Sequence, residues 1–241
     1  MKLSTLNSKL QLLAVGTNAK TIKSDTNNEL TAIMYLASST LSGYDTCPNA
    51  SEGCKKVCLI SAGHGKLTSV QQARNRKTRL YFEKPEEFKK MLFDDLTLFK
   101  SYCNEHGLNG NVRLNGTSDL DFISFKIKDN KNIFQLFTDI NFYDYTKDFS
   151  RTSTEKNYYI LYSRSENTSE LEVKKLIDQN KNVAVVFDEI PDTWNNFEVI
   201  NGDLSDLRTK DKSGVIVGLK AKGLAKKSEL DNGFVIRLKN I

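Results

Sequence analysis

Histidine, proline and cysteine are scarce in this chain of 241 residues, which holds two, three and four of them respectively. His64 and His106 lie in no metallohydrolase motif, and no P-loop, dinucleotide-binding fingerprint or G-x-S-x-G nucleophile elbow occurs. The common hydrolase and nucleotide-binding signatures are therefore missing. Because the few prolines mark no evident linker and no internal repeat is found, the sequence predicts a single domain over residues 1–241.

Long apolar segments are also lacking. No apolar run reaches the roughly 18 residues that a membrane span needs, so we expect no membrane partner. The segment from Met1 to Gly16 is interrupted by polar side chains and has no clean cleavage site, which argues against a signal peptide. We therefore expect a cytoplasmic protein, in a reducing compartment where cysteines more often serve as ligands, catalytic groups or buried side chains than as disulfides.

Charge of one sign is only mildly in excess. The 35 basic residues against 30 acidic ones give a formal net charge of +5, which permits contact with nucleic acid but does not demand it. A basic segment contains Arg74, Arg76, Lys77 and Arg79, and on a helix positions 72, 76 and 79 share one face. This face is either a contact for phosphate or carboxylate groups or an ordinary solvated surface, and the pattern slightly favours the second.

From about residue 30 onward the chain contains short apolar segments and segments with helical periodicity. Two helices are predicted first, one over Thr68–Phe82 and one from Pro85 to about His106. Further helices are predicted over Lys131–Thr138 and Ser169–Gln179. The predicted strands are Leu30–Ala37, Val112–Leu114, Phe142–Tyr145, Tyr158–Tyr162, Val183–Phe187, Phe197–Ile200 and Val215–Leu219. This order predicts an α/β fold with a parallel-stranded (β/α) barrel or partial barrel, whose strands and helices occupy mainly residues 67–241 after a cysteine-rich metal-binding loop at about 42–66.

Three of the four cysteines lie close together in that loop. Cys47, Cys54 and Cys58 are spaced C-x6-C-x3-C, so their thiolates can converge on one metal if the loop folds back. Soft sulfur ligands select zinc or iron–sulfur clusters. Three cysteines without a fourth nearby favour an iron–sulfur cluster with one open iron, whereas a structural zinc site needs four ligands, and His64 is the candidate fourth. The alternatives are three ordinary buried cysteines or an adventitious disulfide. Cys103 is expected to be a buried small side chain.

Polar residues follow each predicted strand directly. In parallel α/β folds the ligand site lies at the carboxyl ends of the strands, although strands commonly end in polar loops in any case. These residues would line a pocket for a small-molecule or nucleotide ligand. The candidate pocket residues are Asn115, Ser118, Asp119, Lys147, Arg164, Asp203, Asp206, Arg208, Lys220 and Lys222.

The sequence also resembles a known family, the gene-product-88 proteins of phages and mobile elements. The resemblance spans about residues 41–223 and is carried by Cys47-Pro48-Asn49-Ala50, the segments 54–59, 112–119, 143–147, 201–208 and 214–223, the Ala73-Arg74…Lys77-Thr78 helix, and Gly63 and Asp211. It implies a phage-related protein of the host cytoplasm. The cysteine loop followed by a strand with a polar tip is similar to radical S-adenosylmethionine barrels with an altered cysteine spacing, since C-x3-C-x2-C is absent. The resemblance assigns no catalytic residue.

Two functions follow from these observations. The first is an enzyme in which an iron–sulfur cluster faces the pocket, acts on a nucleotide or nucleic acid and, in its most specific form, cleaves S-adenosylmethionine. The second is a zinc-stabilised nucleic-acid-binding or replication-associated module without catalysis. In that module the basic helix and tyrosines such as Tyr143, Tyr145, Tyr158 and Tyr159 would contact nucleic acid, although tyrosines in strands are more often packing residues.

Overall fold

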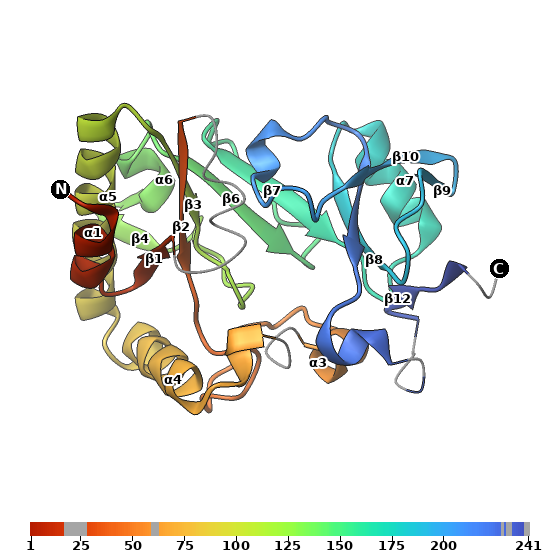
Figure 1. Cartoon of the computed structure of the whole chain (residues 1–241), viewed down its shortest axis with the longest axis horizontal. Coiled ribbons are helices and arrows are strands. Elements are labelled where there is room, and N and C mark those ends of the chain that lie inside the picture. The colour runs from red at the N-terminus through yellow and green to blue at the C-terminus, as the bar shows by residue number, and fades with distance from the viewer. Residues whose placement is uncertain (17–27, 59–62, 228, 230–232, 239–241) are drawn as a thin grey trace.

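The computed structural model describes residues 1–16, 28–58, 63–227, 229 and 233–238, and its centre is an open β-sheet (Figure 1). The sheet has ten strands in the order β1-β2-β3-β6-β7-β8-β11-β10-β9, and β12 pairs with β8 outside this path. The strands from β2 to β10 pair in parallel, whereas β1 and β9 join the two edges in antiparallel orientation. The strands of this sheet are β1 (Leu13–Val15), β2 (Glu29–Met34), β3 (Asn109–Arg113), β6 (Asn141–Thr146), β7 (Tyr158–Ser163), β8 (Val183–Phe187), β9 (Thr193–Trp194), β10 (Phe197–Asn201), β11 (Ile216–Lys220) and β12 (Val235–Ile236).

The helices flank the sheet. They are α1 (Leu3–Lys9), α3 (Glu52–Lys56), α4 (Thr68–Glu83), α5 (Pro85–His106), α6 (Ile133–Leu136) and α7 (Glu170–Asp178), with 3-10 turns η2 (Gly63–Lys66), η3 (Arg208–Lys210) and η4 (Gly223–Lys226). Of these, α3 and α4 lie below the sheet in the view of Figure 1. A separate hairpin pairs β4 (Lys126–Lys128) with β5 (Lys131–Asn132). Within the described residues, no helix has both the length and the apolar composition needed to cross a membrane.

The predicted α/β class with a largely parallel sheet is confirmed, but a closed barrel is not found. Within the described residues β1 and β9 are the two ends of the sheet and do not pair with each other. The predicted cysteine loop over 42–66 also differs from expectation, because α3 and η2 occupy part of it and residues 59–62 lie outside the described part of the chain.

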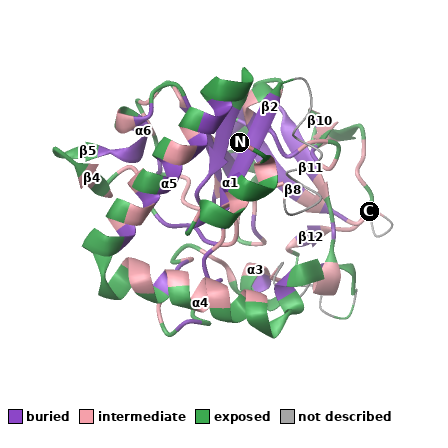
Figure 2. Cartoon of the chain, turned by 60° about the vertical axis from the view of Figure 1, so that its left-hand side comes forward, coloured by how far each residue is buried: buried purple, intermediate pink, exposed green. Residues whose placement is uncertain are grey.

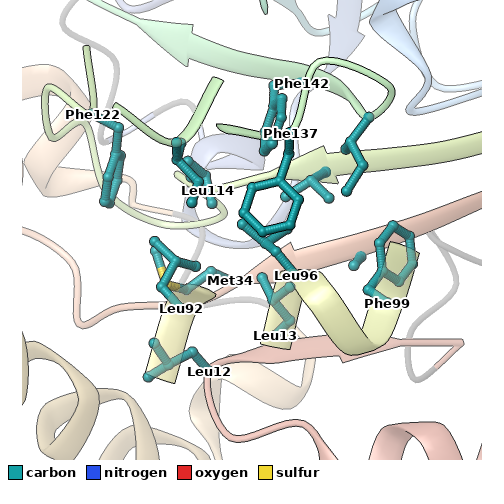
Figure 3. Close-up of a cluster of buried hydrophobic side chains, with 14 of the residues drawn as sticks. Leu12, Leu13, Met34, Leu92, Leu96, Phe99, Leu114, Phe122, Phe137 and Phe142 are labelled. Atoms are coloured by element: carbon teal, nitrogen blue, oxygen red, sulfur yellow. The ribbon is translucent and has the colours of Figure 1, made fainter. Parts of the chain in front are cut away.

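One face of the sheet packs against α5 because side chains alternate along each strand. Val112 and Leu114 point to this face and join a buried cluster with Leu92 and Phe99 of α5 (Figure 3). The exposed residues of α4 and α5 lie on their outer sides, while the strands are largely buried (Figure 2). α5 begins with Pro85 in its first turn and ends at Gly107, whose φ of 64° is the left-handed conformation of a helix C-terminus. Cys103, on the inner side of α5, is buried as predicted.

A buried carboxylate fastens the N-terminal segment to α5. Asp95 is 2% exposed and accepts the backbone N–H groups of Gln11, Leu12 and Leu13 at 2.7 to 3.1 Å. The Lys77 Nζ donates to the carbonyl oxygen of Leu12 at 2.6 Å. Charge-assisted bonds of this kind are stronger than neutral ones, so Asp95 fixes the path of the chain into β1.

The strands separate between β7 and β8. These two strands pair only at Tyr162–Val183 and Ser163–Ala184. Farther along, β12 pairs with β8 instead, with Val235 beside Val186. The carboxyl end of β7 therefore pairs with the start of β8 and not with its carboxyl end. Farther along β8, β12 takes the place of β7.

Candidate functional site

A cavity of about 220 Å³ opens at the carboxyl ends of the parallel strands. Its wall includes Cys47, Cys54 and Cys58, together with residues that follow β3, β6, β10 and β11. Val57, just after α3, packs with Ala225 of η4 and Val235 of β12, so the cysteine segment and the C-terminal part of the chain meet at this end of the sheet (Figure 1). The described structure thus brings the three cysteines and seven of the ten predicted pocket residues to one place.

A carboxylate from a distant loop positions the cysteine segment. Ser51 caps α3, and its Oγ accepts the backbone N–H of Cys54 at 3.2 Å. Glu166, which follows β7, accepts the Ser51 hydroxyl through Oε2 and the backbone N–H of Gly53 through Oε1, each at 2.7 Å. Glu166 therefore binds the first turn of α3 to the loop between β7 and α7.

The three thiols are close enough to influence one another's charge. Burial, with smaller contributions from negative charge on Cys58 and Cys47, raises the pKa of Cys54 to about 11 against the opposing effect of Lys147. Burial likewise raises the pKa of Cys47, with smaller contributions in the same direction from Asp119 and Cys58. All four cysteines lie in the described part of the chain, and none forms a disulfide. Thiolate formation at Cys54 is therefore unfavourable even with Lys147 nearby.

A compact site for one metal ion is not formed. Among the described residues, no three side chains of His, Cys, Asp or Glu are arranged so that they could hold a single ion. His64, the candidate fourth ligand, is exposed in η2 and does not line the cavity. The structure does not bring His64 to the cysteines, because η2 directs that segment toward the start of α4.

The loop after β3 is held rigidly by buried hydrogen bonds. Asn115 donates its backbone N–H to Asp144 Oδ1 at 2.7 Å, and its Oδ1 accepts the Ser118 hydroxyl at 2.8 Å. Asp119 pairs with Arg151 at 2.9 Å and accepts the backbone N–H that follows β6. These polar residues line the cavity, but most of their hydrogen-bonding groups already contact the protein. They shape the wall, and their role toward a ligand stays a prediction.

Lys147 is a buried cation beside the cysteines. Its Nζ donates to Ser163 Oγ at 2.9 Å and lies 3.4 and 3.2 Å from the carbonyl oxygens of Ser163 and Arg164. Burial lowers the pKa of Lys147, whereas negative charge on Cys54 and Asp119 acts to raise it. Because the ammonium of Lys147 contacts these protein acceptors, it has little capacity to donate to a ligand. Its main contribution is positive charge next to Cys54.

The predicted pocket residues divide into two groups. Seven line the cavity, namely Asn115, Ser118, Asp119, Lys147, Asp203, Lys220 and Lys222. Arg164 does not, because its guanidinium lies 6.0 Å from the Trp194 ring and donates to the carbonyl oxygens of Gly233 and Phe234.

Asp206 and Arg208 do not line the cavity either. The segment between β10 and β11 folds back onto the inner face of the sheet, where Arg208 is only 1% exposed and pairs with Asp211 at 3.2 Å.

Arg113 lines the cavity and was missed by sequence reasoning. It is the last residue of β3, and its side chain lies on the face opposite the apolar Val112 and Leu114. Burial acts to lower the pKa of Arg113, but Asp206 and neighbouring tyrosines raise it above its usual value, so the guanidinium stays charged. The available signal was an arginine between two apolar residues in a predicted strand, directly before an Asn-Gly turn.

The basic helix α4 is partly packed and partly exposed. Arg74 is half-buried, with its guanidinium 5.0 Å from the centre of the Tyr35 ring, whereas Arg76 and Arg79 are exposed beside a groove next to the N-terminal segment. Tyr143 and Tyr158 are buried in the sheet. These two tyrosines are packing residues and are not available to stack on bases.

The comparisons with known proteins identify one family. Neither the curated proteins nor the solved structures gave a match. The model of the gene product 88 family matches residues 8–238, which includes the cysteine segment, every strand from β2 to β12 and all residues that line the cavity. The chain is therefore a member of the gene product 88 family.

Proposed function

We propose that this protein is an enzyme whose Cys47, Cys54 and Cys58 hold an iron–sulfur cluster beside a small-molecule or nucleotide pocket. S-adenosylmethionine is the candidate co-substrate. The observation that carries the proposal is that all three cysteines line the same cavity as the strand-end residues. A purely structural metal would not need to share a wall with a ligand-sized cavity, whereas a reactive one would.

The number of sulfur ligands favours a cluster over a single zinc ion. A structural zinc site needs four ligands, whereas the segment supplies three cysteines and His64 does not line the cavity. Charge on Cys58 raises the pKa values of Cys47 and Cys54, so the thiols lie near one another. The described side chains, as placed, form no group that could hold a metal ion, and this applies to either metal.

The surrounding charges also suit a thiolate-bound cluster. Lys147 lies buried near Cys54, and Lys220 and Lys222 line the same cavity. These cations would offset the negative charge of the thiolates, which burial otherwise makes costly. A cluster with three cysteine ligands leaves one iron open and can transfer an electron to a molecule bound there. The protein itself would hold that molecule against the strand ends and limit the access of water.

The test is metal analysis on protein purified without oxygen. We expect a brown protein with stoichiometric iron and sulfide and absorbance near ~400 nm, as thiolate-bound clusters give. Single Ala variants at Cys47, Cys54 and Cys58 should lose the iron, whereas Cys103→Ala, in the core of α5, is the matched control and should keep it. A colourless protein with stoichiometric zinc would contradict the proposal and favour the zinc-stabilised nucleic-acid-binding module.

A further inference from the structure

Arg113 is a buried cation at the cavity wall. Its side chain is 9% exposed, and the residue lines the cavity. Its Nε donates to the carbonyl oxygen of Asn115 at 3.2 Å, and its Nη1 lies 3.5 Å from Asp206 Oδ2. The guanidinium carbon lies 4.3 Å from the centre of the Tyr145 ring. The two hydrogen bonds use Nε and Nη1.

These contacts fix the orientation of the guanidinium plane. The Asn115 carbonyl and Asp206 hold two of its nitrogens, and the Tyr145 ring covers one face. Asp206 is itself held by the hydroxyl of Tyr143 at 3.3 Å. A charged donor in a largely buried side chain is most favourable when water or a ligand completes its hydrogen bonds. The ordered surroundings of Arg113 make its guanidinium a preformed donor at the cavity wall.

The rest of the cavity limits what this donor can bind. Val186, Leu219 and Phe234 give an apolar wall, and Lys220 adds positive charge, whereas Lys222 pairs with Asp203 at 2.6 Å. A planar guanidinium prefers carboxylate or phosphate oxygens as partners, and such bonds are stronger than neutral ones when shielded from water. Lys147 cannot take this part, because its ammonium already contacts Ser163 and the Arg164 carbonyl.

We propose that Arg113 anchors an oxyanion of the bound ligand, a carboxylate or a phosphate, in the cavity that the cysteines share. The ligand is a small organic anion with an apolar part against the β8 and β11 side chains. The inference rests on the proposed ligand-binding role of the cavity, but not on which metal the cysteines hold.

The test measures anion binding to anaerobically purified protein by calorimetric titration with inorganic phosphate and, separately, with acetate. We expect at least one anion to bind the unaltered protein, with phosphate preferred if the ligand is a phosphate ester and acetate if it is a carboxylate. Arg113→Gln should weaken that binding about tenfold or more, because it removes a charged donor. Arg76→Gln, which removes an equal charge from exposed α4, is the matched control and should bind as the unaltered protein does.

A second variant guards against a folding defect. Arg113→Lys keeps the positive charge beside Asp206, so this variant should fold. Because it lacks the planar guanidinium, it should bind the anion several-fold more weakly than the unaltered protein does. Unaltered binding in both Arg113 variants, or no binding of either anion to the unaltered protein, would overturn the proposal. Iron is measured in the same samples. If the unaltered protein holds no iron but the Arg113 variants still bind the anion more weakly, only the cluster is refuted. If the unaltered protein holds full iron but the Arg113 variants bind the anion as well as it does, only the anchor is refuted.

Discussion

The buried carboxyl of Asp144 should make the stability of this protein depend on pH. Asp144 is 1% exposed and accepts the backbone N–H of Asn115 at 2.7 Å, the Asn115 side chain at 3.2 Å and the Tyr158 hydroxyl at 3.3 Å. Burial raises its pKa from 3.8 to about 6, and its hydrogen bonds with Asn115 offset only part of that effect. In the unfolded chain the same carboxyl releases its proton near its ordinary pKa.

The sign and size of the effect follow from this difference. Because the folded pKa lies above the unfolded one, protonation favours the folded state. The contribution is fully present below about pH 4 and is lost as the pH rises through about 6. The difference between 3.8 and about 6 corresponds to about 3 kcal/mol of unfolding free energy. Asp211, whose pKa is also raised to about 6 by burial, is unchanged by the substitution and largely cancels in a comparison with a variant.

The assay is urea unfolding of the unaltered protein and of Asp144→Asn between pH 4.5 and 7.5. As the pH falls across this range, the unaltered protein should gain about 2 kcal/mol relative to the variant, which cannot take up the proton. Asp94→Asn, at an exposed position of α5, should show no such change. A difference that is flat with pH, or that grows with rising pH, would refute the assignment of a raised pKa to Asp144.

Two further substitutions test the elements that position the site. Asp95→Asn should cost about 2 to 4 kcal/mol in urea unfolding, because an amide cannot accept all the backbone N–H groups that the carboxylate accepts. An unchanged midpoint would show that the N-terminal segment does not depend on this contact. Glu166→Gln should loosen α3 by weakening the bonds to Ser51 and Gly53, and should raise iron loss to a chelator about 10- to 100-fold. Equal iron retention in Glu166→Gln and the unaltered protein would rule out this supporting role.

Local patterns predicted most of the elements. The expected helix from Pro85 to about His106 is α5, and the expected strand Val183–Phe187 is β8, because periodicity and turn residues act over a few neighbours. Barrel closure was not predictable in the same way. It depends on whether distant edge strands meet, and each strand's pattern is the same in an open sheet and in a closed one.

The direction in which individual side chains point limited how much of the site could be predicted from the sequence. Residues that follow β3, β6, β10 and β11 line the cavity because parallel strands end at a common edge. Arg208 was predicted to line the cavity but does not, because the segment after β10 folds back onto the sheet. No local sequence pattern predicts this fold. Arg113 was not predicted because a charged residue inside a strand is expected to face solvent. In the structure the Arg113 side chain is buried.

The placement of β12 has a consequence for the order in which the protein is made. A nascent chain leaves the ribosome from its N-terminus, so the cysteine segment and β2 to β8 are available well before Val235. Yet Phe234 lines the cavity and Val235 packs on Val57 beside the cysteines. During translation the cavity therefore lacks part of its wall until Phe234 and Val235 emerge.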